Sequence, residues 1–197
     1  SSGISLTPLE RTVKRDSIRY RHLEISLNRE RRSVDFTIQG PSEPSPKNLE
    51  EVHLQGDVFW PLAMARELDD AVLHLSFNEP GLGTWIFHTR GSAGLVISHE
   101  RLLEKASSNW LVREITLNLK RVLKRIDLTS RSLITLVEPG SCFAGSLLEL
   151  LFAADRSYML DGTFEDSKDP APQLIPSAIN FGPLPMCNGL TRLQTRF

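Results

Sequence analysis

The stretch from residue 133 to 160 constrains the fold more than any other part of this sequence. It opens with Leu-Ile-Thr-Leu-Val, a short apolar run that predicts a buried strand, and the turn-forming pair Pro139-Gly140 ends the run. Small residues follow as far as Ser146, which can cap a helix, and the apolar pattern over residues 147–160 predicts a mostly buried helix. This order directs backbone N–H groups and the positive end of a helix dipole at one point, where an anion or a reacting oxyanion can bind.

Length, charge and composition exclude several classes of protein. The chain has 197 residues, enough for one domain with a sizeable core, and 40% of them are hydrophobic. A net charge of -1 gives no reason to expect nucleic acid or a membrane surface as a partner, and no apolar run approaches the ~20 residues of a membrane span. No signal peptide opens the chain, and its two cysteines have no metal-type or redox spacing, so a cytoplasmic protein is expected. The five histidines show no paired ligand spacing, and no metal site is predicted.

The rest of the chain predicts an alternation of strands and helices, and therefore an α/β fold. Residues 1–19 are polar and predict a linker with a helical turn at residues 9–13, whereas residues 20–197 predict one domain. Small residues at 91–94 predict a second loop, and the acidic segment 161–173 predicts a mobile one. The other expected elements are a hairpin of strands 23–27 and 34–38, a helix over 60–77, a strand over 84–89, a short helix over 99–105 capped by Ser98, a helix from Ser107 or Ser108 to 126, a strand over 132–137 and a short strand within 175–181.

The stretch after the strand at 132–137 resembles the signature of the crotonase (enoyl-CoA hydratase/isomerase) superfamily. That signature is a strand, then Gly-x-Ala-x-Gly-Gly-Gly, then Glu-Leu and a later Asp. The residues that carry the resemblance are Val137-Glu138-Pro139-Gly140, Ala144-Gly145-Ser146, Glu149-Leu150 and Ala154-Asp155. The loop is one residue longer than the signature, and Ala144 and Ser146 replace two glycines. The resemblance implies a crotonase-like fold of stacked β-β-α units. The chain begins at Ser1 and stops within an apparent helix start at 190–197, which suggests a domain that is incomplete at its C-terminus.

Longer phrases resemble one group within the superfamily, the lyases that open the ring of an oxygenated benzoyl-CoA. These phrases are Glu-Pro-Gly-Ser-Cys-Phe-Ala-Gly at 138–145, Phe-Ala-Ala-Asp-Arg-Ser-Tyr-Met at 152–159, Trp-Pro-Leu at 60–62, Ala-Arg-Glu-Leu-Asp-Asp-Ala at 65–71 and Asn-Phe-Gly at 180–182. Such lyases have two crotonase-like segments, and this chain resembles the second, more degenerate one. The resemblance implies C–C cleavage with formate release in aerobic aromatic degradation. It also implies that the substrate is a coenzyme A thioester and that no further cofactor takes part. The expected partners are the other segment of the same protein and further copies in a homo-oligomer.

The superfamily holds a thioester enolate with two backbone N–H groups, which together form an oxyanion hole. The resemblance places one of them at Gly145 or Ser146, and the other at Ala93 or Gly94. In the alternative interpretation, both loops are only tight turns that lead into helices.

Three side chains decide what chemistry the segment can do. Glu149 matches the first family glutamate, which helps to hold a water in hydratases; alternatively, it is a buried residue paired with an arginine, for example Arg192. Ala178 holds the place of the second family glutamate and cannot transfer a proton, so a two-glutamate hydration is not expected. Cys142 lies beside the predicted hole and is either a nucleophile or an inert buried cysteine.

A basic run lies on the helix that precedes the central strand. It could bind coenzyme A phosphates or nucleic acid, or form a solvated helix face, and no aromatic residues interleave with it. The residues are Arg113, Lys120, Arg121, Lys124 and Arg125.

Three functions remain open. As half of an enzyme, the segment would keep an open pocket with free N–H groups at Gly145. As a scaffold, it would have that pocket filled by Phe143 or Leu147. An independent hydratase is opposed by Ala178.

Overall fold

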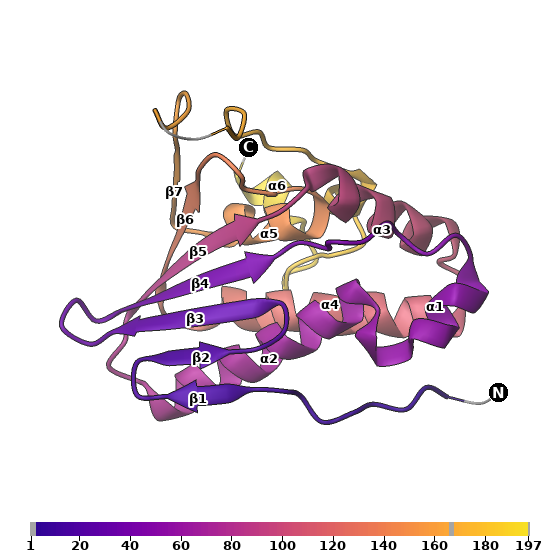
Figure 1. The fold of residues 1–197 in the computed structure, drawn as a ribbon, viewed down its shortest axis with the longest axis horizontal. Coiled ribbons are helices and arrows are strands. Elements are labelled where there is room, and N and C mark those ends of the chain that lie inside the picture. Colours follow the sequence, from indigo (N-terminus) through magenta and orange to yellow (C-terminus); the bar gives the residue numbers. More distant parts are fainter. Residues whose placement is uncertain (1–2, 166–167, 197) are drawn as a thin grey trace.

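A computed structural model describes residues 3–165 and 168–196, and a seven-stranded sheet forms its centre (Figure 1). The strands lie in the sheet in their chain order, antiparallel from β1 to β4 and parallel from β4 to β7. They are β1 (Thr12–Lys14), β2 (Ser17–Arg19), β3 (Leu23–Asn28), β4 (Ser33–Gln39), β5 (Thr84–Arg90), β6 (Ser132–Val137) and β7 (Arg156–Met159). The predicted α/β class is confirmed.

The predicted hairpin is confirmed as β3 and β4. Ile25 lies opposite Phe36 in the antiparallel register, and the inward side chains of both strands are buried while the outward ones of β3 are exposed. Apolar and polar residues alternate in the sequence because successive side chains of a strand point to opposite faces, one buried and one exposed.

Helices α2, α4 and α5 pack on one face of the sheet, whereas α1 packs against other helices beyond it (Figure 1). The helices are α1 (Leu49–Gln55), α2 (Trp60–Asn78), α3 (Ala93–Lys105), α4 (Trp110–Asp127), α5 (Gly145–Ala153) and α6 (Arg192–Arg196), with short 3-10 turns at Gly56–Val58 and Ala178–Phe181. Helix α2 agrees with its prediction. Helix α4 also forms, but its cap is Asn109 rather than Ser107 or Ser108, because the Asn109 side chain accepts hydrogen bonds from two first-turn amides.

Helix α3 is longer than predicted. It begins at Ala93, where the Ser92 side chain accepts a hydrogen bond from the amide of Leu95. The expected loop at 91–94 is therefore wrong at residues 93–94, and the helix predicted over 99–105 forms and ends as expected but begins at Ala93 rather than behind Ser98.

Helix α5 is shorter than predicted, and the expected helix over 147–160 is wrong in its second half. It ends at Ala153, and residues 156–159 pair with β6 as the edge strand β7. Asp155 lies in the turn between α5 and β7. Its carboxylate accepts a hydrogen bond of 2.8 Å from the amide of Leu133 near the start of β6, which holds the chain beside β6. Ser146 does not cap α5; it lies in the first turn of the helix.

The N-terminal segment and residues 175–181 also differ from their predictions. The expected linker at 1–19, with its helical turn at 9–13, contains β1 and β2, and Ile18 of β2 is buried in the core. Residues 1–2 lie outside the described part. Instead of a strand within 175–181, a single bridge joins Ile175 to Ala144 and a 3-10 turn follows.

No helix within residues 3–165 and 168–196 combines the length and the apolar character that a membrane crossing requires.

Candidate functional site

The N-terminus of α5 is the predicted oxyanion site, and its amides already have partners within the chain. Gly145 begins the helix with a φ of 48°, and its N–H donates to the carbonyl of Ile175 at 3.0 Å. The N–H of Ser146 donates to a carboxylate oxygen of Glu100 at 2.5 Å. A side chain of the protein therefore occupies the place where an oxyanion would bind.

Glu100 reaches this place from α3, and it is the functional residue that sequence reasoning missed. It is 5% exposed, and its second carboxylate oxygen accepts a hydrogen bond from Ser177 Oγ at 3.0 Å. Burial raises the pKa of Glu100, while the hydrogen bonds from Ser146 and Ser177 act in the opposite direction. A sequence signal existed, because Glu100 shares a helical stripe with the buried residues Val96 and Leu103.

Gly145 is required for this arrangement. A Cβ at this position would overlap the carboxylate of Glu100, and the positive φ disfavours other residues as well. Phe143 and Leu147, the residues expected to fill the site of a scaffold, are both buried in core clusters. Glu100, and neither of these two, makes the hydrogen bond to the Ser146 amide.

Glu149 is fully buried and paired. One carboxylate oxygen accepts from Asn180 Nδ2 at 2.7 Å and the other from Arg192 Nη1 at 2.8 Å, so the predicted ion pair with Arg192 is confirmed. Arg192 in turn binds Asp127 through Nε at 2.9 Å and Nη2 at 2.7 Å. Burial raises the pKa of Glu149, against the effect of Asn180 and Arg192. These contacts tie α5 to α6 and to the end of α4, a structural role.

A turn at residues 177–181 connects the two buried glutamates. Asn180 Nδ2 donates both to Glu149 and, at 2.9 Å, to the carbonyl of Gly145. The side chains of Ser177 and Asn180 also cap this turn reciprocally. The neighbouring hydrogen bond from Ser177 to Glu100 completes a polar network that surrounds the start of α5.

The other half of the predicted hole lies in the first turn of α3. Gly94 is exposed and Ala93 is partly exposed. Within the described residues neither amide donates a hydrogen bond to the chain, as is usual for the first turn of a helix. The structure therefore leaves the predicted amides at Ala93 and Gly94 without a hydrogen-bond acceptor in the described residues, whereas the Gly145 amide donates to Ile175 and the Ser146 amide to Glu100.

Cys142 lies in the core. Its side chain is fully buried, and it sits so close to Gly40 that a Cβ there would come to 3.0 Å of the sulfur. Its own N–H donates to Thr89 Oγ1 at 2.9 Å. Burial raises the pKa of the Cys142 thiol, which keeps it in the weakly nucleophilic protonated form.

A cavity of about 240 Å³ adjoins Glu100. Its walls are largely apolar, and Glu100, Ser177 and Ala178 are among the residues that line it. Its other lining residues are Ile97, Arg101, Leu103, Glu104, Ser107, Thr116, Ile179 and Pro183. Ala178, which the sequence places at the second glutamate of the superfamily, thus lines a cavity together with the carboxyl group of Glu100. In the part of the chain that the structure describes, no cluster of three His, Cys, Asp or Glu side chains could hold a metal ion.

Comparison with known proteins gives one close sequence relative. Over 197 residues the chain is 44% identical to benzoyl-CoA-dihydrodiol lyase from Aromatoleum evansii. The match covers 100% of this chain but 35% of the lyase, so the chain spans about a third of the length of this relative. The predicted similarity to a segment of such a lyase is confirmed. No family model matches the chain.

Solved structures similar to this chain include two enoyl-CoA hydratases. The one from Shewanella pealeana has 17% identity and a TM-score of 0.47, and the match covers 69% of this chain and 45% of the hydratase. The one from Geobacillus kaustophilus has 14% identity and a TM-score of 0.45, with 77% and 48% covered.

Proposed function

We propose that this chain is a structural segment of a lyase that opens the ring of an oxygenated benzoyl-CoA, with C–C cleavage and release of formate. The 44% identity to a segment of benzoyl-CoA-dihydrodiol lyase supports the substrate class. In this proposal the reaction takes place in another part of the longer protein. The segment contributes a rigid α/β body that packs against that part and within a homo-oligomer in the cytoplasm.

One observation supports the structural role. The backbone N–H of Ser146 already donates a hydrogen bond to the carboxyl group of Glu100. An oxyanion hole stabilises a reaction only if its N–H groups are free to point at the developing negative charge. Here the N–H donates to a carboxyl group of the protein itself. A thioester oxygen would have to displace Glu100, and when ionised this group would also repel a developing enolate.

The remaining catalytic positions of the superfamily support the same role. Glu149 is held by Asn180 and Arg192, and both of its oxygens are engaged in the fold. Ala178 has no proton to transfer. Neither position offers a group that is free to act on a substrate.

Isothermal titration with benzoyl-CoA tests the proposal. We expect no binding by the folded wild-type chain. Glu100→Ala, which frees the Ser146 amide, is expected to gain weak binding, whereas the control Glu50→Ala, an exposed residue on α1 outside the cavity, is not. Binding of benzoyl-CoA by the wild-type chain would contradict the proposal.

The cavity beside Glu100 supports a second candidate, an enzyme half in which Glu100 supplies the proton-transfer group that Ala178 lacks. In that case the wild-type chain would bind benzoyl-CoA, and Ile179→Trp, which fills the cavity, would abolish the binding. Absence of binding to wild type excludes this candidate and agrees with the structural role.

A further inference from the structure

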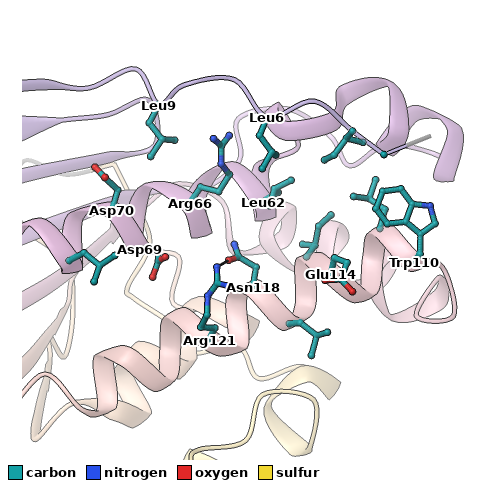
Figure 2. Close-up of a pocket in the computed structure, with 16 residues that line it drawn as sticks. Leu6, Leu9, Leu62, Arg66, Asp69, Asp70, Trp110, Glu114, Asn118 and Arg121 are labelled. Atoms are coloured by element: carbon teal, nitrogen blue, oxygen red, sulfur yellow. Dashed lines mark hydrogen bonds between the residues drawn. The ribbon is translucent and has the colours of Figure 1, made fainter. Parts of the chain in front are cut away.

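A second, larger cavity lies over the seam between α2 and α4, away from the site at α5 (Figure 2). It measures about 640 Å³ and is bordered by the extended segment at residues 3–9. Leu6 and Leu9 come from that segment, Leu62 and Arg66 from α2, and Trp110 from the start of α4. We call this depression, together with the one described below, the α2–α4 groove.

Three of the charged residues in this part of the groove, Arg66, Asp69 and Asp70, are paired within the chain. Arg66 donates to Asp57 at 3.1 Å, and Asp69 accepts from Arg125 at 2.5 Å. Asp70 accepts from Tyr20 Oη at 2.7 Å. These three groups need no polar ligand. Glu114 is 3.7 Å from the exposed Arg113, and Arg121 is described below.

The surface that remains without a partner in this part of the groove is apolar. Leu6 is 59% exposed, Leu117 is 46% exposed and Leu73 is 36% exposed. Exposed apolar side chains that gather along a hollow mark a site of protein interaction, whereas scattered ones do not.

The groove continues beyond this part into a depression of about 440 Å³, which shares Leu73 and Arg121 with it. Phe77 and Leu128 line this end and are 79% and 68% exposed. Three cations, Arg121, Lys124 and Arg125, line it as well, and no acidic residue does. This end is therefore both apolar and basic.

Two of these three cations have no acidic partner. Arg121 donates to the neutral amide oxygen of Asn118 at 2.6 Å, and Lys124 forms no ion pair with any residue that the structure describes. Arg125 is neutralised by Asp69. An occupant of the groove would thus meet two uncompensated positive charges at one end and apolar side chains along the rest.

We propose that the α2–α4 groove is the docking site of an amphipathic helix that carries acidic residues at one end. Helix α4 has 18 residues, so the groove can accommodate a partner helix of up to about 27 Å. Such a helix would lay its apolar stripe on the seam between α2 and α4, and its acidic turn would face Arg121 and Lys124. The inference is independent of the proposed function, because the groove shares no lining residue with the cavity at Glu100.

Calorimetry with two designed peptides tests this inference. Both have the 18-residue length of α4 and the same leucine stripe, but one has glutamates in its last turn and the other lysines. We expect the glutamate peptide to bind the wild-type chain about tenfold more tightly than the lysine peptide. Leu117→Asp should abolish binding, whereas the control Leu54→Asp, which lies on α1 outside the groove, should leave it unchanged.

Reversal of the charges provides the second arm of the test. The double variant Arg121→Glu, Lys124→Glu should prefer the lysine peptide. Equal binding of the two peptides, binding that survives Leu117→Asp, or no binding would overturn the proposal. Sedimentation of the chain as a dimer that Leu117→Asp dissociates would also overturn it, because a second copy would then cover the groove.

Discussion

Removing the carboxyl group of Glu100 should destabilise the fold by a predictable amount. Glu100→Ala leaves the Ser146 N–H, which is nearly inaccessible to solvent, without its acceptor, and an unpaired buried donor costs about 1–3 kcal/mol. Burial raises the pKa of Glu100, so the fold gains no net stability from its negative charge. Ser177 is partly exposed, and its hydroxyl can turn to water. We therefore expect urea denaturation to show a loss of about 1–3 kcal/mol.

Acetate provides a specific rescue, because it replaces the carboxylate that the substitution removes. Acetate in excess should raise the stability of Glu100→Ala but not of the wild type, since a ligand that binds only the folded state stabilises it. The control is ethylammonium, which has a similar size and the opposite charge. A loss below about 0.5 kcal/mol, or an equal effect of acetate on both proteins, would refute the assignment of Glu100 to the Ser146 amide.

The pH dependence gives an independent check. Burial raises the pKa of Glu100 above the value of 4.5 that applies to an unperturbed glutamate. The folded state therefore binds the proton more tightly than the unfolded state, so the stabilising contribution is fully present below about pH 4.5 and is lost as the pH rises through the folded-state pKa. Glu100→Gln does not titrate, and Glu149 is common to both proteins. The stability of the wild type relative to Glu100→Gln should thus fall as the pH rises from 4.5; a constant difference would contradict this.

Three further substitutions or reactions test other parts of the structure. Arg192→Met should cost about 3–5 kcal/mol in urea denaturation, because it leaves Glu149 buried without its cation. The control Arg121→Ala should change stability little. Equal effects of the two substitutions would argue against the buried pair. Gly145→Ala should destabilise the fold by about 2–4 kcal/mol, because residue 145 has a positive φ and a Cβ there would overlap Glu100. The control Gly94→Ala, with space around it in α3, should stabilise the fold by about 0.5 kcal/mol. The opposite order of the two melting temperatures would be inconsistent with the site. An aromatic disulfide reagent should label Cys187 in the native chain and Cys142 only after denaturation, and rapid native labelling of both would show that Cys142 is accessible.

The sequence predicts those elements whose local pattern agrees with their tertiary environment. The alternation at 23–27 and 34–38 and the apolar stripe over 60–77 identify the hairpin and α2 because one face of each packs on the core. The start of β7 shows where this reasoning fails. Residues 156–159 follow an apolar helix without a Gly or Pro to separate them, and only their pairing with β6 makes them a strand. Strands β1 and β2 likewise depend on the edge of β3.

The sequence predicts only part of the candidate site. The small residues before Leu147 predict a helix start, which the structure places at Gly145, and the alternative that pairs Glu149 with Arg192 agrees with the ion pair. The pattern does not predict Glu100 in the site, because the expected loop at 91–94 leaves out the first turn of α3 and with it the stripe that Glu100 shares with Val96. A polar residue on an apolar stripe indicates a buried partner, but the identity of that partner depends on the fold.

The amide resonance of Ser146 in a ¹⁵N-labelled chain reports whether Glu100 holds this N–H. We expect this signal to shift with pH as Glu100 ionises, Glu100→Gln to abolish the shift, and benzoyl-CoA to leave the signal of the wild type in place. A Ser146 signal that does not change with pH and moves on addition of benzoyl-CoA would show that the amide is free and binds the thioester, and Glu100 would then not block the site.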